Sequence, residues 1–387
     1  MSRQLAHKLH SLAALLCSAA LTLFCTSAQG EEGEPIDTCA RSAILMERHT
    51  GRVLFSHNIG EALPMASTTK VMTALMAIEY GHLDEVVTVG RNAYGVPGTS
   101  IYLDLGEQIP LRDLLYGLML ASGNDAAVAI AEHISGDTAS FCQQMTQRAA
   151  ELGCTDTVFV NPNGLPVSGH HTTAKDLALI AREAMSHTLF REIVSTQRAS
   201  IPWAGRSYSR ILNNKNRLLS TYAGATGIKT GYTKAAGRCL VFGAERGGLE
   251  VIGVVLNCSD WFNEAARLMD LGFERYEMFE MFSEGETVRH LPVLNGQQQT
   301  ACIAAAKALR APVWKGTVPD VEVNLPDTIE AGTGAGTAVG EARLIEDGVV
   351  LASTPLIVSE TIPQRDYAFE LERVLRSWPI QQQSIAE

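Results

Sequence analysis

The stretch of sequence that decides the fold is Pro64-Met65-Ala66-Ser67-Thr68-Thr69-Lys70-Val71-Met72-Thr73-Ala74-Leu75. From Thr68 to about Tyr80, apolar residues recur at helical spacing without a proline, which predicts a helix with one buried face. Ser67 stands three residues before Lys70, so both side chains can lie on the same face of that helix. Taken alone, a serine at this position is typical of an ordinary helix cap.

Two further short motifs follow in order along the chain. Ser122-Gly123-Asn124 lies between two predicted helices, and Lys229-Thr230-Gly231 lies on a predicted strand. Each has an ordinary interpretation when it stands alone: Asn124 and Asp125 would cap the following helix, and the lysine would be a solvated strand residue. Together, each motif lies where a serine acyl-transfer enzyme would place it: at the start of a helix, between two helices, and on a strand. Their order therefore indicates that chemistry.

The three motifs provide the reacting groups of such a site. A serine hydroxyl is a weak nucleophile until a base takes its proton, so Ser67 is the candidate nucleophile and Lys70 the candidate base. Lys70 can act as a base only if burial and a nearby positive charge lower its pKa, and Lys229 would supply that charge. Ser122 would relay a proton to the leaving amine, and Asn124 would hydrogen-bond Lys70 and a substrate amide.

The third motif predicts how a substrate is held. Gly231 carries no side chain, so a substrate backbone can approach this strand and add to its edge. Lys229 and Thr230 would bind a substrate carboxylate. The backbone N–H groups of Ser67 and Tyr232 would form an oxyanion hole. Each donor of such a hole typically raises the catalytic rate by a factor of about 10²–10³.

Four segments together resemble the low-molecular-mass penicillin-binding proteins, specifically the serine-type D-alanyl-D-alanine carboxypeptidases. They are residues 64–75, Asn161 to Leu165, Thr172 to Leu179 and Gly227 to Gly237. The resemblance implies an α+β fold, the penicillin-recognising serine-hydrolase (β-lactamase/transpeptidase-like) domain with an antiparallel sheet and helices. The remainder of the chain resembles the small all-β second domain of that family.

The same resemblance implies a function. A member of this family removes the terminal D-alanine from peptidoglycan stem peptides that end in D-Ala-D-Ala. Ser67 would be the acyl-ester nucleophile, Lys70 the general base and Lys229 a substrate binder, with Ser122-Gly123-Asn124 as the second motif. β-Lactams would acylate the serine as covalent inhibitors. The chain departs from the family pattern at Tyr232, where a histidine is common.

The predicted elements separate helices from an antiparallel sheet, which favours α+β over a parallel doubly wound fold. We expect a signal peptide at residues 1–30, a catalytic domain at 31–280, a β-rich domain at 281–365 and a short tail at 366–387. In the tail, Asp366 to Trp378 is a candidate helix with a narrow apolar face, so membrane association should be weak or absent. In the catalytic domain we expect a hairpin of Ala43 to Met46 with Arg52 to Phe55. The other expected helices are Leu111 to Leu120, Ala126 to Ile134, Thr138 to Leu152, Thr173 to Ser186 and Asn263 to Met269, the last ending near Gly272. The expected strands are Ser200 to Trp203, Thr226 to Tyr232, Arg238 to Gly243 and Leu249 to Leu256.

The first thirty residues have the order of a secretory signal. Arg3 and Lys8 form a basic start, an apolar run extends from Leu12 to Phe24, and small residues follow. The alternative is a membrane anchor, but the run is short against the about twenty residues that a span needs. We therefore expect an exported protein, located in the cell wall or at the outer face of the cytoplasmic membrane.

Composition disfavours several other classes of protein. The chain has 31 basic and 42 acidic residues and a net charge of −11, which argues against nucleic acid as a partner. The cysteines lack the spacing of a zinc site. Cys239 and Cys258 flank a predicted turn and are one candidate disulfide, with buried free thiols as the alternative. For His170-His171 a solvated loop pair is preferred over a metal site, and we expect no metal and no cofactor.

Two other functions share the same acylation step. A β-lactamase would hydrolyse its acyl-enzyme rapidly, and a non-catalytic penicillin-binding sensor would not turn over at all. Class A β-lactamases place a glutamate in the loop after the second motif to activate water. The corresponding stretch, Val158 to Thr173, contains no acidic residue. The sequence therefore favours the carboxypeptidase over the β-lactamase.

Overall fold

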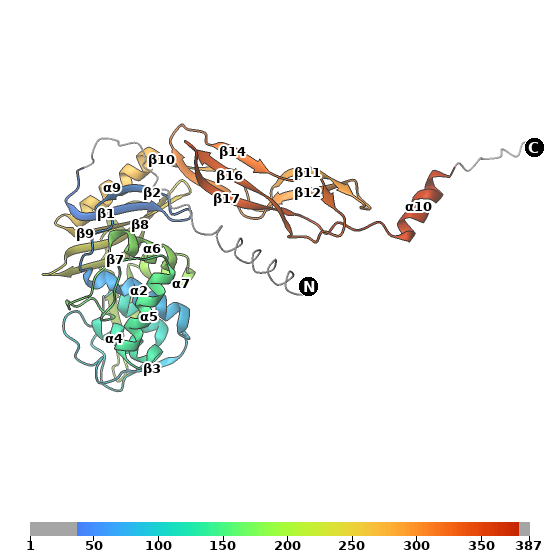
Figure 1. Ribbon diagram of the computed structural model, residues 1–387. Coiled ribbons are helices and arrows are strands. Elements are labelled where there is room, and N and C mark those ends of the chain that lie inside the picture. The colour runs from blue at the N-terminus through green and yellow to red at the C-terminus, as the bar shows by residue number, and fades with distance from the viewer. Residues whose placement is uncertain (1–36, 379–387) are drawn as a thin grey trace, which may run out of the picture. The chain divides into compact units, whose positions relative to one another are not determined.

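The structure is a computed structural model that describes residues 37–378 (Figure 1). The expected signal peptide at residues 1–30 lies outside the described residues, as do residues 379–387 of the tail. Within the described range, helices mixed with antiparallel strands come first and an all-β domain follows. The predicted α+β fold class with a second β domain is therefore confirmed.

A five-stranded antiparallel sheet forms the centre of the first domain, in the strand order β2-β1-β9-β8-β7. The predicted hairpin and the three long strands after residue 224 all belong to this sheet. Strand β7, which carries the third motif, lies at one edge of the order, so one side of it has no strand neighbour within the sheet. The five strands are β1 (Ala40–Glu47), β2 (Val53–His57), β7 (Ala225–Thr233), β8 (Gly237–Arg246) and β9 (Leu249–Cys258).

The helices pack around α2 (Lys70–Tyr80), which follows a short 3₁₀ turn, η1 (Ala66–Thr69). The sequence predicts one buried face for this helix, but every residue from Lys70 to Ala77 is buried. Helices α3 to α7 all contact α2, and a helix enclosed in this way is buried all round. These helices are α3 (Leu111–Met119), α4 (Asn124–Ser135), α5 (Thr138–Glu151), α6 (Ala174–Ala184) and α7 (Thr188–Ser195).

Local signals set most helix ends correctly and missed two short helices. Thr173 is the N-cap of α6, as predicted, and its side chain accepts a hydrogen bond from the Asp176 N–H. The expected elements do not include α7 or α8 (Leu218–Thr221). Helix α8 is a single turn, too short to show a period, whereas α7 buries Phe190, Ile193 and Val194 at helical spacing, a signal that is present in the sequence. Two small ribbons complete the domain: β3 (Val86–Thr88) pairs with β4 (Gln108–Pro110), and β5 (Arg198–Ile201) pairs with β6 (Arg210–Asn213).

The two faces of the sheet are covered by different helices, because successive strand side chains point to opposite faces. Val254 of β9 is buried among the helices around α2. The other face is covered by α9 (Trp261–Arg275), which Figure 1 shows on the opposite side of the sheet from α2 and α6. The sequence predicts that α9 ends near Gly272, but the helix continues for three more residues. Gly272 is instead a packing position, since a Cβ there would lie 2.7 Å from Leu45 Cδ2.

The β domain has its own core, a sheet in the order β14-β16-β17-β12-β11-β15. After it, the predicted tail helix forms as α10 (Tyr367–Ser377), with Asp366 as N-cap and no buried residue. Among the described helices, none has the length and apolarity to cross a membrane. The strands are β10 (Tyr276–Phe282), β11 (Thr287–Leu294), β12 (Thr300–Ala305), β13 (Leu309–Trp314), β14 (Asp320–Asn324), β15 (Ile329–Glu330), β16 (Ala338–Glu346) and β17 (Val349–Val358), and β10 pairs with β13.

The candidate disulfide between Cys239 and Cys258 is wrong. Both cysteines are free thiols, and the register of the β8–β9 hairpin places Leu240 opposite Val255. Cys239 is therefore two positions out of register with Cys258. The β1–β9 pairing brings Ala40, at the start of β1, opposite Cys258 instead.

A buried ion pair ties the β5–β6 ribbon to the segment before β4. Arg210 donates to the two carboxylate oxygens of Glu107 at 2.5 and 2.6 Å. Both side chains are buried, with 3% of the Arg210 side chain and 2% of the Glu107 side chain exposed. We expect Arg210→Met to destabilise the fold by about 3–5 kcal/mol, because the buried Glu107 carboxylate would lose its cationic partner and keep only the Asp104 N–H. Urea unfolding measures this change. Combining it with Glu107→Leu should recover most of the loss, and Arg41→Met at an exposed pair should leave the unfolding midpoint unchanged. A midpoint unaffected by Arg210→Met would contradict this account.

Candidate active site

The first motif places its serine and lysine side by side, as predicted. Ser67 lies in η1, whose turn is closed by Thr69 Oγ1 donating to the Ala66 carbonyl at 2.8 Å. Lys70 is the first residue of α2 and is fully buried. Its Nζ lies 3.1 Å from Ser67 Oγ. The pair can therefore exchange a proton directly.

Two further oxygens fix the direction of the Lys70 amine. Its Nζ lies 2.8 Å from Asn124 Oδ1 and 2.5 Å from the Asn163 carbonyl oxygen, and both oxygens can only accept hydrogen bonds. A neutral amine has two N–H bonds and one lone pair. When the two acceptors take the N–H bonds, the lone pair faces the Ser67 hydroxyl. The sequence did not assign a role to Asn163, since a backbone carbonyl leaves no signature in residue type.

The electrostatics of the site favour this neutral amine. Burial lowers the pKa of Lys70 well below its ordinary value, the charges of Lys229 and Lys215 lower it further, and Asp125 opposes the shift. Burial, with a smaller contribution from Lys215, lowers the pKa of Lys229 to about 7. Lys215 was not predicted from the sequence. It lies in the loop after β6, with its Nζ 3.4 Å from Thr99 Oγ1.

The second motif forms the turn between α3 and α4. Ser122 is buried there with a φ of 65°, a left-handed conformation that is uncommon for serine. The Asn124 amide is held from both ends, because its Oδ1 accepts from Lys70 and its Nδ2 donates to the Pro97 carbonyl at 2.7 Å. The N-cap of α4 is Gly123 without a side-chain bond, so Asn124 and Asp125 do not act as the cap.

The third motif brings β7 against the nucleophile. Lys229 and Thr230 are buried, and Tyr232 is 62% exposed. A Cβ on Gly231 would lie 3.0 Å from the backbone nitrogens of Ser67 and Thr68. The absence of a side chain therefore keeps the Ser67 N–H accessible next to the strand, as an oxyanion hole requires.

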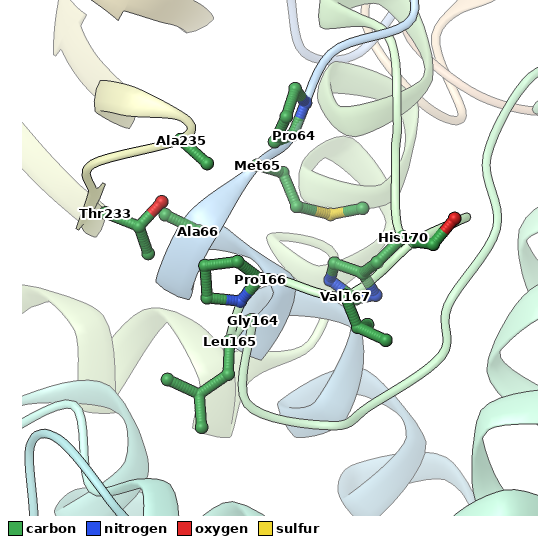
Figure 2. Close-up of a pocket in the computed structure, with 11 residues that line it drawn as sticks. Pro64, Met65, Ala66, Gly164, Leu165, Pro166, Val167, His170, Thr233 and Ala235 are labelled. Atoms are coloured by element: carbon green, nitrogen blue, oxygen red, sulfur yellow. The ribbon is translucent and has the colours of Figure 1, made fainter.

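A pocket of about 370 Å³ opens beside the serine turn (Figure 2). A loop approaches the turn so closely that a Cβ on Gly164, whose φ is 86°, would lie 1.9 Å from the Ala66 carbonyl oxygen. Among the described residues that line the pocket, none carries a carboxylate, lysine or arginine side chain. They are Pro64, Met65, Ala66, Gly164, Leu165, Pro166, Val167, Ser168, His170, Thr233 and Ala235.

The histidine pair is not the solvated loop pair that the sequence favoured. His170 is 6% exposed, and its ring faces the pocket region beside Met65 and Val167 (Figure 2). Only His171 is partly exposed, near Asp156. The tertiary structure buries His170 because its two ring nitrogens both find hydrogen-bond partners inside the protein.

One group of described residues, Glu79, Glu183 and His187, has the donor types of a metal site. Arg148 already occupies it, since its guanidinium donates to both carboxylate oxygens of Glu79 at 2.8 Å and lies 3.5 Å from Glu183. The group is an ion-pair network of neighbouring helices and supports no metal assignment.

The charge of Lys229 is one cause of the low pKa of Lys70, so removing it has a definite sign. We expect Lys229→Met to raise the pKa of Lys70 toward the ordinary lysine value, because a neighbouring positive charge disfavours the ammonium form. NMR titration of lysine side chains, assigned with Lys70→Arg, measures this pKa. Lys234→Met removes an exposed lysine from the same region and should leave it unchanged. A pKa of Lys70 that stays constant or falls in Lys229→Met would contradict the assignment.

Two family models match this chain. One described as D-alanyl-D-alanine carboxypeptidase matches residues 28–260, and one described as the C-terminal domain of penicillin-binding protein 5 matches residues 276–364. D-alanyl-D-alanine carboxypeptidase DacF from Bacillus subtilis is 32% identical over 382 residues, covering 95% of this chain and 98% of that protein. DacC from Escherichia coli is 32% identical over 370 residues and covers 90% of each.

Solved structures agree with these matches. Penicillin-binding protein 5 from Haemophilus influenzae superposes with a TM-score of 0.72 at 27% identity, over 86% of this chain and 100% of that one. A mutant of the Streptomyces K15 DD-transpeptidase gives a TM-score of 0.58 at 33% identity, over 62% of this chain and 99% of that one. With a family model spanning more than half of its residues and a relative aligned along nearly its whole length, the chain belongs to the D-alanyl-D-alanine carboxypeptidase family and is a serine-type carboxypeptidase.

Proposed function

We propose that this protein is an exported D,D-carboxypeptidase that removes the terminal D-alanine from peptidoglycan stem peptides through a Ser67 acyl-enzyme. The observation that carries the proposal is the contact between Ser67 Oγ and Lys70 Nζ at 3.1 Å, in a site where burial lowers the pKa of the lysine. A nucleophile with an adjacent neutral base is the arrangement that covalent acyl transfer requires.

Acylation uses the three motifs together. Lys70 Nζ takes the proton of the Ser67 hydroxyl while Oγ bonds to the scissile carbonyl carbon. The negative charge on the carbonyl oxygen is stabilised by the N–H groups of Ser67 and Tyr232. When the C–N bond breaks, the proton passes from Lys70 through Ser122 to the leaving amine of D-alanine. Water then attacks the acyl ester with Lys70 again as the base, which regenerates the serine.

Substrate binding uses the free edge of β7. An extended peptide can pair with this edge strand through backbone hydrogen bonds, and Gly231 leaves room for it next to Ser67. Lys229 and Thr230 would hold the terminal carboxylate. Asn124 would donate one Nδ2–H to a substrate carbonyl, while its Oδ1 continues to accept a hydrogen bond from Lys70 Nζ.

We also propose an extracytoplasmic location, because residues 1–30 have the composition of a secretory signal, and weak or absent membrane binding, because the apolar face of the tail is narrow.

Flotation of residues 31–387 with anionic liposomes should leave most protein in the bottom fraction, with or without residues 366–387. Strong flotation that is lost on truncation would mean that α10 binds lipid.

A penicillin should form one covalent adduct on Ser67, because the lactam presents a strained amide to the same nucleophile. Intact-mass measurement of residues 31–387 should find one adduct per chain, and Ser67→Ala should remove it. The same preparation should release D-alanine from a tripeptide that ends in D-Ala-D-Ala. An adduct that persists in Ser67→Ala would refute the nucleophile, and acylation without D-alanine release would favour the sensor.

The penicilloyl enzyme should be long-lived, which separates this function from that of a β-lactamase. The stretch from Val158 to Thr173 offers the site the Asn163 carbonyl and the His170 ring, whose pKa is lowered to about 4, but no carboxylate to activate water. We expect water to release penicilloate from Ser67 over minutes or longer, while enzyme that has not been acylated by penicillin turns peptide over. The measurement is the decay of the adduct by mass. Fast, repeated hydrolysis of nitrocefin without D-alanine release would reverse the assignment.

A further inference from the structure

His170 joins two parts of the active site that are about a hundred residues apart in sequence. Its Nδ1 accepts the Val160 N–H at 3.0 Å, and its Nε2 lies 2.8 Å from Thr69 Oγ1. Thr69 is the last residue of η1 and is fully buried. The imidazole therefore connects the loop that begins at Val160 to the turn that carries Ser67.

The hydrogen atoms in this connection have one consistent arrangement. Thr69 Oγ1 donates its own hydrogen to the Ala66 carbonyl, so it accepts from His170 Nε2. The Val160 N–H points at Nδ1, so Nδ1 carries no proton. Both ends require the neutral tautomer with the proton on Nε2. Burial is the largest cause that lowers the pKa of His170 to about 4, which keeps the ring neutral at pH 7.

The loop held by His170 is the one that reaches the catalytic lysine. It places the Asn163 carbonyl 2.5 Å from Lys70 Nζ, and Thr73 of α2 holds the preceding Pro162 carbonyl at 2.6 Å. We propose that His170 is a positioning residue, which aligns the Asn163 carbonyl with Lys70 by tying Val160 to Thr69. The lone pair of Lys70 then stays directed at Ser67 Oγ. This inference rests on the proposed Ser67 acylation.

The test measures the rate at which a β-lactam acylates residues 31–387, at saturating and at subsaturating β-lactam concentrations. His170→Phe keeps an aromatic ring but removes both nitrogens. We expect its maximal acylation rate to fall by about tenfold or more, because small misplacements of reacting groups are costly, while the dissociation constant before acylation changes by less than about threefold. His170→Gln keeps a donor for Thr69 and should recover most of the rate.

Two further variants separate positioning from general packing. Thr69→Val removes the acceptor of the His170 bond and also the Thr69–Ala66 bond inside η1, so its loss should equal or exceed that of His170→Phe. Adding His170→Phe to it should cost little more, because the His170 connection is then already broken. His171→Phe changes the neighbouring histidine and should keep the wild-type rate. If near-UV circular dichroism finds His170→Phe unfolded, His170→Asn takes its place, because this polar side chain is too short to bond both Val160 and Thr69 and should lose the rate that His170→Gln keeps.

Three results would overturn the proposal: wild-type rates in folded His170→Phe, wild-type rates in Thr69→Val, or additive losses in the double variant. A wild-type chain that no β-lactam acylates would instead contradict the proposed function on which it rests.

Discussion

The burial of the Lys70 amine is the constraint on which the rest of the site depends. Moving a charged ammonium group into a protein interior is costly, and a buried lysine responds by losing its proton. Here two fixed acceptor oxygens satisfy the N–H bonds of the neutral amine, and a serine hydroxyl lies at the third position. The same burial that makes a charged lysine unfavourable here favours the neutral amine that the proposed base requires.

The other two motifs matter because they complete that environment. Asn124 comes from the α3–α4 turn, and Lys229 from the edge strand of the sheet. The turns that carry the first two motifs have unusual backbone conformations: Ala66, next to Ser67, has a φ of 49°, and Ser122, two residues before Asn124, has a φ of 65°. Non-glycine residues in that region are concentrated at functional sites, where the surrounding structure keeps them in place.

Glycine is required where two backbones meet at the serine. Gly231 of β7 and Gly164 of the loop after α5 both approach η1. A Cβ on Gly164 would lie 1.9 Å from the Ala66 carbonyl oxygen, and a Cβ on Gly231 would crowd the Ser67 and Thr68 nitrogens at 3.0 Å. The serine turn is therefore enclosed by main chain, and its amide groups remain available to a substrate. The described residues that line the pocket beside it carry no carboxylate, lysine or arginine side chain.

The sequence by itself indicated the family, the residues of the candidate site and most of the elements. The three motifs, the Thr173 cap and the alternation in the long strands are local patterns, and local patterns report residue types and periodicity. They predicted Ser67, Lys70, Asn124 and Lys229 as neighbours, and the structure brings them together.

Only the tertiary structure decided which groups complete the site. Asn163 acts through a backbone carbonyl, Lys215 through its charge from a distant loop, and His170 through two hydrogen bonds to residues far away in sequence. The partner of Cys258 was likewise fixed by strand register, which a symmetric spacing about a turn does not reveal. These contacts depend on how separate segments pack, and no single segment encodes that.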